Sequence, residues 1–517
     1  MKKMMMIVLA CVIAVSTFAG GGKESGTSTA GGFKAAGIYE KYDLAQPKTI
    51  YVYMIGDPAK DIDEIMGMAN KQYFKPLLNT EVVLTFITWA ELADKYPLVL
   101  ASGEDVDIIH AAPWNNYEQE AAKGSFRALT DQFIQEWMPA TWESQPKISW
   151  YQARSGGKVY AVPAGDINVE YKFPVIRDDL RTKYNLGELK NWDDLRNYVY
   201  TVASKENGIQ AYAAPASTIE LMWTYLEAQN VKWSSGPIYY VWDIKNKQEA
   251  KPEDIYFLYN SPWYKQYALE MADWAAHNVW SRNVMNNTIP QRDSFVQGKS
   301  ASMYWNGSVF DAGKEMAKNG VGTPGYYDLS PATPSSAEVY SNNMFAITSA
   351  SKNPDRAALV LDLMKNNIPL QNLLMGGVEG RHYVLIGNNE AADGPESADY
   401  AWDNWTWALR SPKRIQRGYA ADTDPRRIEM ENAFTAKLWE PLMDGFRVDS
   451  TAFSTEWTVI SSLIEEYDDS FQCGVFGGQT AAKYDEFTAK LKAAGIDKVT
   501  QAFKTQYAAF LREIQSN

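Results

Sequence analysis

The sequence predicts an α/β fold divided into two large domains or three smaller ones. Between residues 50 and 111, segments typical of strands alternate with segments typical of helices, which favours a mostly parallel sheet. The chain has 517 residues, which is more than one hydrophobic core ordinarily serves. Its hydrophobic fraction of 46% is usual for a globular protein, so wholesale disorder and a collagen-like repeat are excluded.

The N-terminus carries the pattern of an export signal, which we assign to residues 1–19. It begins with MKK, continues as an apolar run to Val15 and ends in a small-x-small cleavage site at residues 17–19. Residues 20–33 are rich in Gly, Ser and Thr and predict a flexible tether. No later stretch approaches about 18 uninterrupted apolar residues, so we expect no membrane-spanning helix.

The elements expected after the tether follow the order strand, helix, strand, helix, strand. The first helix places apolar residues on one face, at a spacing of three and four residues. The expected bounds are 50–56, 62–73, 81–88, 90–102 and 106–111. Trp89 and Trp114 each follow one of these strands, where α/β folds place the loops that contact ligands.

Three helices farther along the chain have recognisable ends. Asn191 is typical of an N-cap, and Gly208 is expected to terminate the helix that follows it. Pro354 occupies the first position of a second helix. The region from Glu486 predicts two amphipathic helices that are broken at Gly495.

Composition excludes several classes of function. The formal net charge of −13 is unsuited to nucleic acid, which requires clusters of Lys and Arg. The three histidines, His110, His277 and His382, lie far apart, and neither a zinc spacing nor a calcium loop is present. We therefore expect no metal and no cofactor. Only Cys473 follows the signal, so the mature chain has no intramolecular disulfide.

Two glycine motifs resemble nucleotide sites without meeting their requirements. Residues 320–325 match G-x-G-x-x-G, but they follow a helix-like segment, and Pro324 stands where a helix would have to begin. Residues 298–300 imitate the end of a P-loop, but Asp293 stands where the leading Gly belongs. Both segments are interpreted as turns.

Aromatic residues gather in three places outside the expected core strands. Trp114 follows a strand, residues 303–307 (MYWNG) end another strand-like run, and Trp402, Trp405 and Trp407 share a polar segment. A pyranose ring has C–H faces that stack on indoles, and its hydroxyl rim hydrogen-bonds to Asp, Asn or Glu. The clusters favour a saccharide site, although core packing also explains any one of these rings.

The ordered motifs resemble the family 1 extracellular solute-binding proteins of ABC importers, in the longer branch with an extra C-terminal domain. The matching segments run in order through most of the mature chain. They are DII (107–109) with WNNY (114–117) and AAKG (121–124), GKVYAVP (157–163), VIRDDLRTKY (175–184) with WDDL (192–195), F-x-x-G-K-x-A (295–301), KNPDRA (352–357), GVEGRHY (377–383), GF (445–446) and LKAAGI (491–496).

The resemblance implies a two-lobed periplasmic-binding-protein fold (type II-like) with an inter-lobe cleft and a helical C-terminal extension. Chain crossovers are expected near Ala164, Asn342 and Gly387. The expected N-terminal lobe is 34–164 with 342–387 returning to it. The expected C-terminal lobe is 165–341 with 388–517, including the extension.

The function implied by the resemblance is capture of a carbohydrate in the cleft by hinge closure and its delivery to an ABC permease. The receptor is expected to be a monomer without nucleic-acid partners. Gly20 stands where lipidated relatives carry Cys, which argues against a lipid anchor and favours a periplasmic location. Two alternatives stay open: an enzyme that cleaves polysaccharide with a carboxylate pair, and a receptor for peptides or other solutes.

Ligand-binding residues are assigned from their expected loop positions in the cleft. Trp114, Trp305 and Trp402 are expected to stack on sugar rings, and the polar members to hydrogen-bond with hydroxyls. The full set is Asp57, Trp89, Trp114, Asn116, Trp223, Trp305, Asn306, Glu379, Trp402 and Trp405. No catalytic residue is expected.

Overall fold

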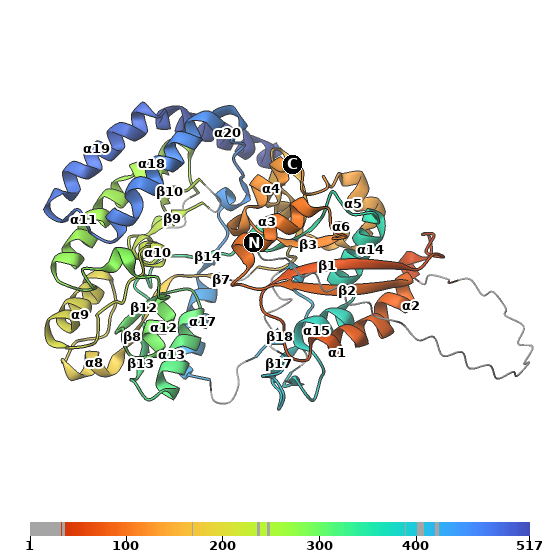
Figure 1. Cartoon of the computed structure of the whole chain (residues 1–517), viewed down its shortest axis with the longest axis horizontal. Helices are drawn as coiled ribbons and strands as arrows, with labels where there is room; N and C mark the ends of the chain where they lie inside the picture. The colour runs from red at the N-terminus through yellow and green to blue at the C-terminus, as the bar shows by residue number, and fades with distance from the viewer. Residues whose placement is uncertain are drawn as a thin grey trace, which may run out of the picture.

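The computed structural model describes residues 33, 37–167, 169–234, 238–245, 249–387, 389–400, 408–418 and 423–516. Figure 1 shows two lobes side by side, with the long C-terminal helices lying over the second. The first lobe is built on β1 (Lys48–Ile55) and β2 (Thr80–Ile87), and the second on β8 (Phe173–Arg177). This is the two-lobed α/β architecture that the resemblance predicts.

The first lobe contains a five-stranded sheet of order β2-β1-β3-β15-β6, in which β3 is Ile108–Ala111, β15 Met344–Ile347 and β6 Ala161–Pro163. The expected strands in the N-terminal region are confirmed. β1 runs parallel to β2 and β3, whereas β15 is antiparallel to both β3 and β6. The expectation of a mostly parallel sheet is therefore wrong for the half formed by β3, β15 and β6. The reason is that β15 enters from the hinge side, after the chain has crossed from the other lobe.

Helices cover both faces of this sheet. α1 (Ile62–Ala69) continues through a π-helical turn, Asn70–Phe74, into α2 (Lys75–Leu78), so the expected helix is longer than predicted. The expected helix before β3 is α3 (Leu92–Ser102). Pro354 begins α14 (Pro354–Asn366), whose apolar residues are buried against the sheet, and α15 (Ile368–Gly376) follows.

The second lobe is organised around an antiparallel sheet of order β12-β8-β13, with β12 at Ser302–Trp305 and β13 at Pro324–Tyr326. The parallel pattern of the N-terminal strands therefore does not extend to this lobe. Asn191 caps α9 (Trp192–Lys205) by accepting a hydrogen bond from the Asp194 N–H at 3.0 Å, as expected. The helix ends at Lys205, shortly before Gly208.

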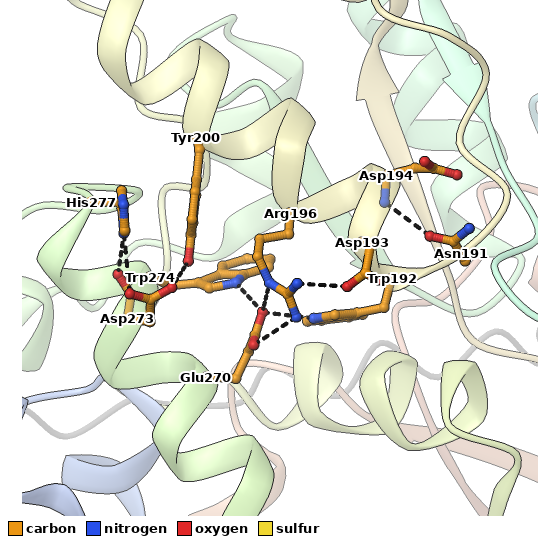
Figure 2. A network of polar contacts seen from close by, with 10 residues as sticks. All are labelled: Asn191, Trp192, Asp193, Asp194, Arg196, Tyr200, Glu270, Asp273, Trp274 and His277. Atoms are coloured by element: carbon orange, nitrogen blue, oxygen red, sulfur yellow. Dashed lines mark hydrogen bonds and ion pairs between the residues drawn. The ribbon is translucent and has the colours of Figure 1, made fainter.

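α9 is fixed to α11 (Pro262–Ala276) by a polar cluster within the lobe (Figure 2). Glu270 accepts hydrogen bonds from Arg196 at 2.5 and 2.8 Å and from the indole N–H groups of Trp192 and Trp274 at 2.9 and 2.8 Å. The two indole rings stack at a centroid distance of 5.3 Å. Both carboxylate oxygens are thus satisfied, as a partly buried charge requires.

The C-terminal region forms α18 (Ser454–Gln472), α19 (Thr480–Ala493) and α20 (Ile496–Ser516), which pack on the second lobe above α11 (Figure 1). The break at Gly495, where φ is +95°, is confirmed, and α19 begins earlier than expected. α20 also reaches the first lobe. There the Phe510 ring lies edge-on to Tyr151, and Glu513 is 3.6 Å from Arg154.

A small crossover sheet joins the lobes. It has the order β19-β14-β7, in which β7 is Val169–Glu170, β14 Ser335–Ala337 and β19 Leu438–Trp439. β14 is antiparallel to β7 and parallel to β19, so two passages of the chain between the lobes hydrogen-bond to each other and to a third strand from later in the chain. This crossover sheet is the structural candidate for a hinge.

The third passage lies later in the chain than the expected position near Gly387. Residues 408 and 409 belong to the core of the first lobe, and Tyr400 donates a hydrogen bond to the Leu374 carbonyl at 2.6 Å. The packing changes to the second lobe at α17 (Pro425–Ala436), whose Met430 and Phe434 join the core around β8.

The remaining elements are α4 (Tyr117–Lys123), α5 (Asp131–Trp137), α6 (Pro139–Ser144), α7 (Lys147–Gln152), β4 (Arg154–Ser155), β5 (Lys158–Val159), α8 (Asp178–Lys183), α10 (Ile219–Ala228), β9 (Val231–Trp233), β10 (Tyr240–Asp243), β11 (Tyr256–Phe257), α12 (Gln291–Val296), α13 (Ser308–Lys318), β16 (Tyr383–Leu385), β17 (Glu390–Asp393) and β18 (Gln416–Arg417). Within the part of the chain that the structure describes, no helix combines the length and the apolar character needed to cross a membrane.

Candidate functional site

A cavity of about 1110 Å³ lies between the two lobes, and residues of both lobes and of the crossover sheet line it. Trp114 and Asn116 contribute from the first lobe, Trp305 from the second, and Glu170 from the crossover sheet. This volume is slightly above the roughly 300–1,000 Å³ typical of sites for small ligands. The cavity is therefore the principal candidate for a binding site.

The wall on the first lobe is built by the turn after β3. Pro113 starts a single helical turn, and Asn116 ends it in the left-handed region at φ +59°, which Asn tolerates better than most residues. The turn holds Trp114 at the cavity, where its indole N–H donates to the Asn342 carbonyl at 2.9 Å. Trp114 is 44% exposed, and the ring of Trp89 lies 6.0 Å away.

The wall on the second lobe is a group of aromatic rings. Trp305 stands at the end of β12, and the following residue, Asn306, accepts a hydrogen bond from the Ser308 N–H at 3.1 Å at the start of α13. Trp223 stacks on Trp233 at a centroid distance of 4.6 Å and meets Tyr239 edge-on at 5.0 Å. Five of these six residues line the cavity, all but Ser308.

Charged groups form the floor of the cavity next to the crossover sheet. The Lys172 ammonium lies 3.1 Å from Glu170 and 4.7 Å from the centroid of the Trp305 ring. Lys232 approaches the same carboxylate at 3.6 Å from behind. The Glu227 carboxylate accepts a hydrogen bond from the Lys172 backbone N–H at 2.7 Å.

These surroundings shift the pKa values of two carboxyl groups in opposite directions. Burial alone would raise the pKa of Glu170, but the ammonium groups of Lys172 and Lys232 outweigh it and lower the pKa to about 2. Burial raises the pKa of Glu227 to about 8 despite the opposing charge of Lys172. Near neutral pH, Glu170 is therefore ionised and Glu227 carries a proton.

The structure brings half of the sequence-predicted site residues together. The residues that line the cavity are Trp114, Asn116, Trp223, Trp305 and Asn306. Trp89 contacts Trp114 without belonging to the lining. Asp57 and Glu379 are exposed and lie outside the lining, because the chain after β1 turns toward α1 and Glu379 is held in a turn by a backbone bridge to Tyr383. Trp402 and Trp405 lie outside the described residues.

Sequence reasoning missed several lining residues. Trp233 ends β9, so the rule that singled out Trp305 at the end of a strand would also have found it. Tyr171 and Lys172 directly follow the first crossover, a position that predicts contact with a cleft between lobes. Arg427 and Glu431 lie on α17, and no sequence signal places that helix at the cavity.

A group of three side chains with metal-ligand chemistry occurs outside the cavity, formed by Asp61, His382 and Glu396. The Arg381 guanidinium already lies 3.2 Å from Asp61 and 2.8 Å from Glu396. His382 Nδ1 accepts a hydrogen bond from the Val378 N–H, which places the ring proton on Nε2, facing Asp61 at 3.2 Å. Arg381 thus supplies the positive charge that a metal ion would bring.

Comparisons with known proteins agree with this architecture. A family model described as "Bacterial extracellular solute-binding protein" matches residues 59–367. A second model, described as a domain of unknown function (DUF3502), matches residues 442–512, which include α18, α19 and most of α20. A carbohydrate ABC transporter substrate-binding protein of Streptococcus pneumoniae serotype 4 is 21% identical and covers 96% of this chain and 97% of its own.

Two solved structures illustrate the similarity in fold. The N-glycan transport solute binding protein (NgtS) from Streptococcus pneumoniae, in complex with Man1GlcNAc, has a TM-score of 0.65 and 17% identity. The match covers 90% of this chain and 100% of the NgtS chain. The alginate-binding protein AlgQ2, solved without calcium ion, has a TM-score of 0.64 and 16% identity, and covers 90% of this chain and 98% of its own. At these identities the likeness concerns the fold.

Proposed function

We propose that this chain, which belongs to the bacterial extracellular solute-binding protein family, captures an oligosaccharide between its lobes and presents it to a membrane permease. The observation that carries the proposal is the cavity between the lobes, lined by indole rings from both sides and by amide and carboxylate groups between them. The relatives named above as carbohydrate and N-glycan binding proteins support a sugar as the solute.

The lining matches the surface chemistry of a sugar. The C–H faces of a pyranose stack on indole rings, and this contact buries apolar area on both partners. Trp114 offers such a surface on the first lobe, and Trp305 on the second. The side chains of Asn116 and Glu338 lie on the same lining and can hydrogen-bond with hydroxyl groups.

Binding would favour closure because the two aromatic walls belong to different lobes. A ligand shifts a conformational equilibrium only through contacts that differ between the two states. When the lobes are apart, a sugar can touch Trp114 or Trp305, and only the closed form lets it touch both. The crossover sheet supplies the few residues about which a hinge motion can occur.

We further propose that the receptor acts in the periplasm as a monomer without a lipid anchor. The N-terminal signal pattern supports export, and Gly20 in place of the acylated Cys supports an unanchored protein. Mass determination of the mature protein in the membrane and soluble fractions tests the anchor. Light scattering with and without ligand tests the monomer.

A ligand screen tests the proposal directly. Thermal melting is measured with fragments of glucan, mannan, xylan, pectin and alginate and with peptides, and at least one saccharide is expected to raise Tm. Mass spectrometry of solute released from the purified protein identifies a copurifying ligand. A response to peptides alone would contradict the sugar, and product formation over hours of incubation would favour the polysaccharide-cleaving alternative.

Closure is tested separately by small-angle X-ray scattering. The radius of gyration is expected to fall when the saccharide that raises Tm is added, because the lobes approach each other. An unchanged radius at saturating ligand would contradict the hinge mechanism without contradicting binding.

A further inference from the structure

We propose that the cleft selects neutral oligosaccharides over polyuronates, an inference that rests on the proposed function. The similar structures named above include both an N-glycan binder and an alginate binder, so the shared fold does not decide between these two ligand classes. What bears on the choice is how the charges at the cavity are paired. The lining carries five carboxylates and three cations: Glu170, Asp311, Glu338, Asp393, Glu431, Lys172, Lys314 and Arg427. Two more cations, Lys232 and Arg410, lie behind the lining and pair with Glu170 and Glu338.

Lys172 is already neutralised within the protein. Its ammonium lies 3.1 Å from Glu170 and over the face of Trp305, and its side chain is only 7% exposed. A carboxylate of the ligand could reach this ammonium only by competing with Glu170. Because the Lys172 side chain is nearly buried, such an exchange would break a short contact that the fold already provides.

Arg427 on α17, which also lines the cavity, is engaged in the same way. Its guanidinium lies 3.3 Å from Asp311 and 3.1 Å from Glu431, two carboxylates that also line the cavity. One cation thus faces two acids, so a uronate could reach the Arg427 guanidinium only by competing with both of these carboxylates.

The same groups suit a neutral sugar. A hydroxyl group donates well to a carboxylate, and such a charge-assisted hydrogen bond requires no cation on the protein. Glu338 is held at the cavity by Arg410, at 2.9 Å, with its second oxygen bonded to the Asn342 side chain. The lining therefore offers acceptors to hydroxyls and opposes a second set of carboxylates, because like charges placed together across a binding site disfavour the wrong partner.

The test uses ligand pairs that differ only at C6. β-1,4-Mannopentaose is compared with β-1,4-pentamannuronate, and cellopentaose with its C6-oxidised form. The affinities are measured by isothermal titration calorimetry at low salt. If the screen identifies a ligand, its neutral and C6-carboxylate forms are compared as a third pair. The neutral member of the pair that binds is expected to bind about tenfold or more tightly. Equal or tighter binding of the uronate would overturn the selectivity and leave the proposed function intact. A failure of every saccharide to bind would overturn the proposed function and this inference with it.

A charge variant identifies the groups responsible. The double variant Asp311→Asn, Glu431→Gln releases Arg427 and is expected to raise the affinity for the uronate severalfold. The ratio of the affinities for the neutral ligand and the uronate is then expected to fall. Glu81→Gln is the matched control, because it also removes a carboxylate from a cation, Lys75 at 3.3 Å, but on the outside of the first lobe. If the two variants changed the affinity for the uronate equally, the effect could not be attributed to charges in the cleft.

Discussion

Two tryptophan pairs in this molecule have similar geometry and opposite surroundings. In the second lobe, Trp192 and Trp274 stack at 5.3 Å with an interplanar angle of 18°, and both are buried (Figure 2). In the first lobe, the rings of Trp89 and Trp114 lie 6.0 Å apart with an angle of 35°, and they are 47% and 44% exposed.

The difference between the pairs lies in what satisfies each indole and what covers it. Glu270 accepts both N–H groups of the buried pair, so those rings are complete within the fold. Trp114 donates to the Asn342 carbonyl beside the hinge, and that bond holds its apolar face toward the cavity. A large aromatic surface that is held in place yet uncovered is typical of a binding site. Residue type alone does not distinguish the two roles.

The largest expected effect is on stability, from the buried pair. Trp274→Ala removes a fully buried indole and is expected to lower the free energy of unfolding by roughly 3–5 kcal/mol. Urea denaturation measures this change, and ligand affinity is measured at a temperature where the variant is folded. Unchanged affinity in the folded variant is expected. If Trp274→Ala weakened ligand binding as much as a substitution in the cavity lining does, the buried pair would not be purely structural.

Glu270→Ala should have the next largest effect. It leaves Arg196 and both indole N–H groups without their acceptor and is expected to cost about 2–3 kcal/mol of stability. Asp193→Ala is the matched control, because Asp193 binds the same guanidinium at 2.6 Å from an exposed position. Its expected cost is under about 0.5 kcal/mol. Equal losses in the two variants would show that the buried acceptor has no special role.

Trp114→Ala is expected to have the opposite effect to the variants of the buried pair: it should weaken ligand binding and hardly change stability. Removing an exposed stacking surface should weaken saccharide binding by about 10–100-fold, as loss of a central aromatic anchor does. Trp114→Phe should recover part of this affinity. Trp137→Ala, which removes a ring stacked on Tyr42 at 5.1 Å in the same lobe and outside the cavity lining, is the control and should leave affinity unchanged.

The comparison extends to Glu227, which accepts a hydrogen bond from the Lys172 N–H, and predicts a dependence on pH. Burial raises the pKa of Glu227 from 4.5 to about 8. Its native state therefore binds more protons than its unfolded state between these values, and the free energy of unfolding falls as pH rises through this window. Glu227→Gln mimics the protonated form. It is expected to stabilise the protein, and the stabilisation at pH 8 is expected to be several times that at pH 5. A stabilisation equal at both pH values would contradict the raised pKa.

Asn116 provides the smallest and most specific test. Its φ of +59° is a conformation that Gly adopts freely, so Asn116→Gly removes the amide with little backbone strain. We expect affinity to fall by about 3–10-fold, as for the loss of one hydrogen bond, with Tm nearly unchanged. Asn116→Ala controls for the backbone and should cost about 1–2 kcal/mol of stability in addition. Full affinity in the Gly variant would exclude the amide from binding.

The sequence was most informative where the signal is local. The Asn191 cap, the start of α14 at Pro354 and the break at Gly495 depend on a few neighbouring residues, and each is found as expected. Trp114 was located because it follows a strand, and Trp305 because it ends one. β15 could not have been assigned its antiparallel direction, since that depends on the path of the chain through the other lobe.

The electrostatics of the cavity were beyond the reach of sequence patterns. Lys172 and Glu170 are nearly adjacent in the chain, but their third member, Lys232, comes from β9, and Arg427 comes from α17. Such groups meet only because the crossover segments bring distant elements to one cavity. Asp57 was predicted from its place after a strand, and that rule fails where the following loop turns away from the cleft.

The position of β15 has a consequence for how the chain is made. This strand lies between β3 and β6, so the first sheet is incomplete until residue 347 has been synthesised. Pairings across such long stretches of sequence form slowly, because a large loop must close before they contribute. During synthesis, β3 and β6 therefore lack their partner strand until most of the second lobe has been synthesised. This delay suits a member of an extracellular protein family, since a chain that cannot yet complete its first lobe stays unfolded until late in its synthesis.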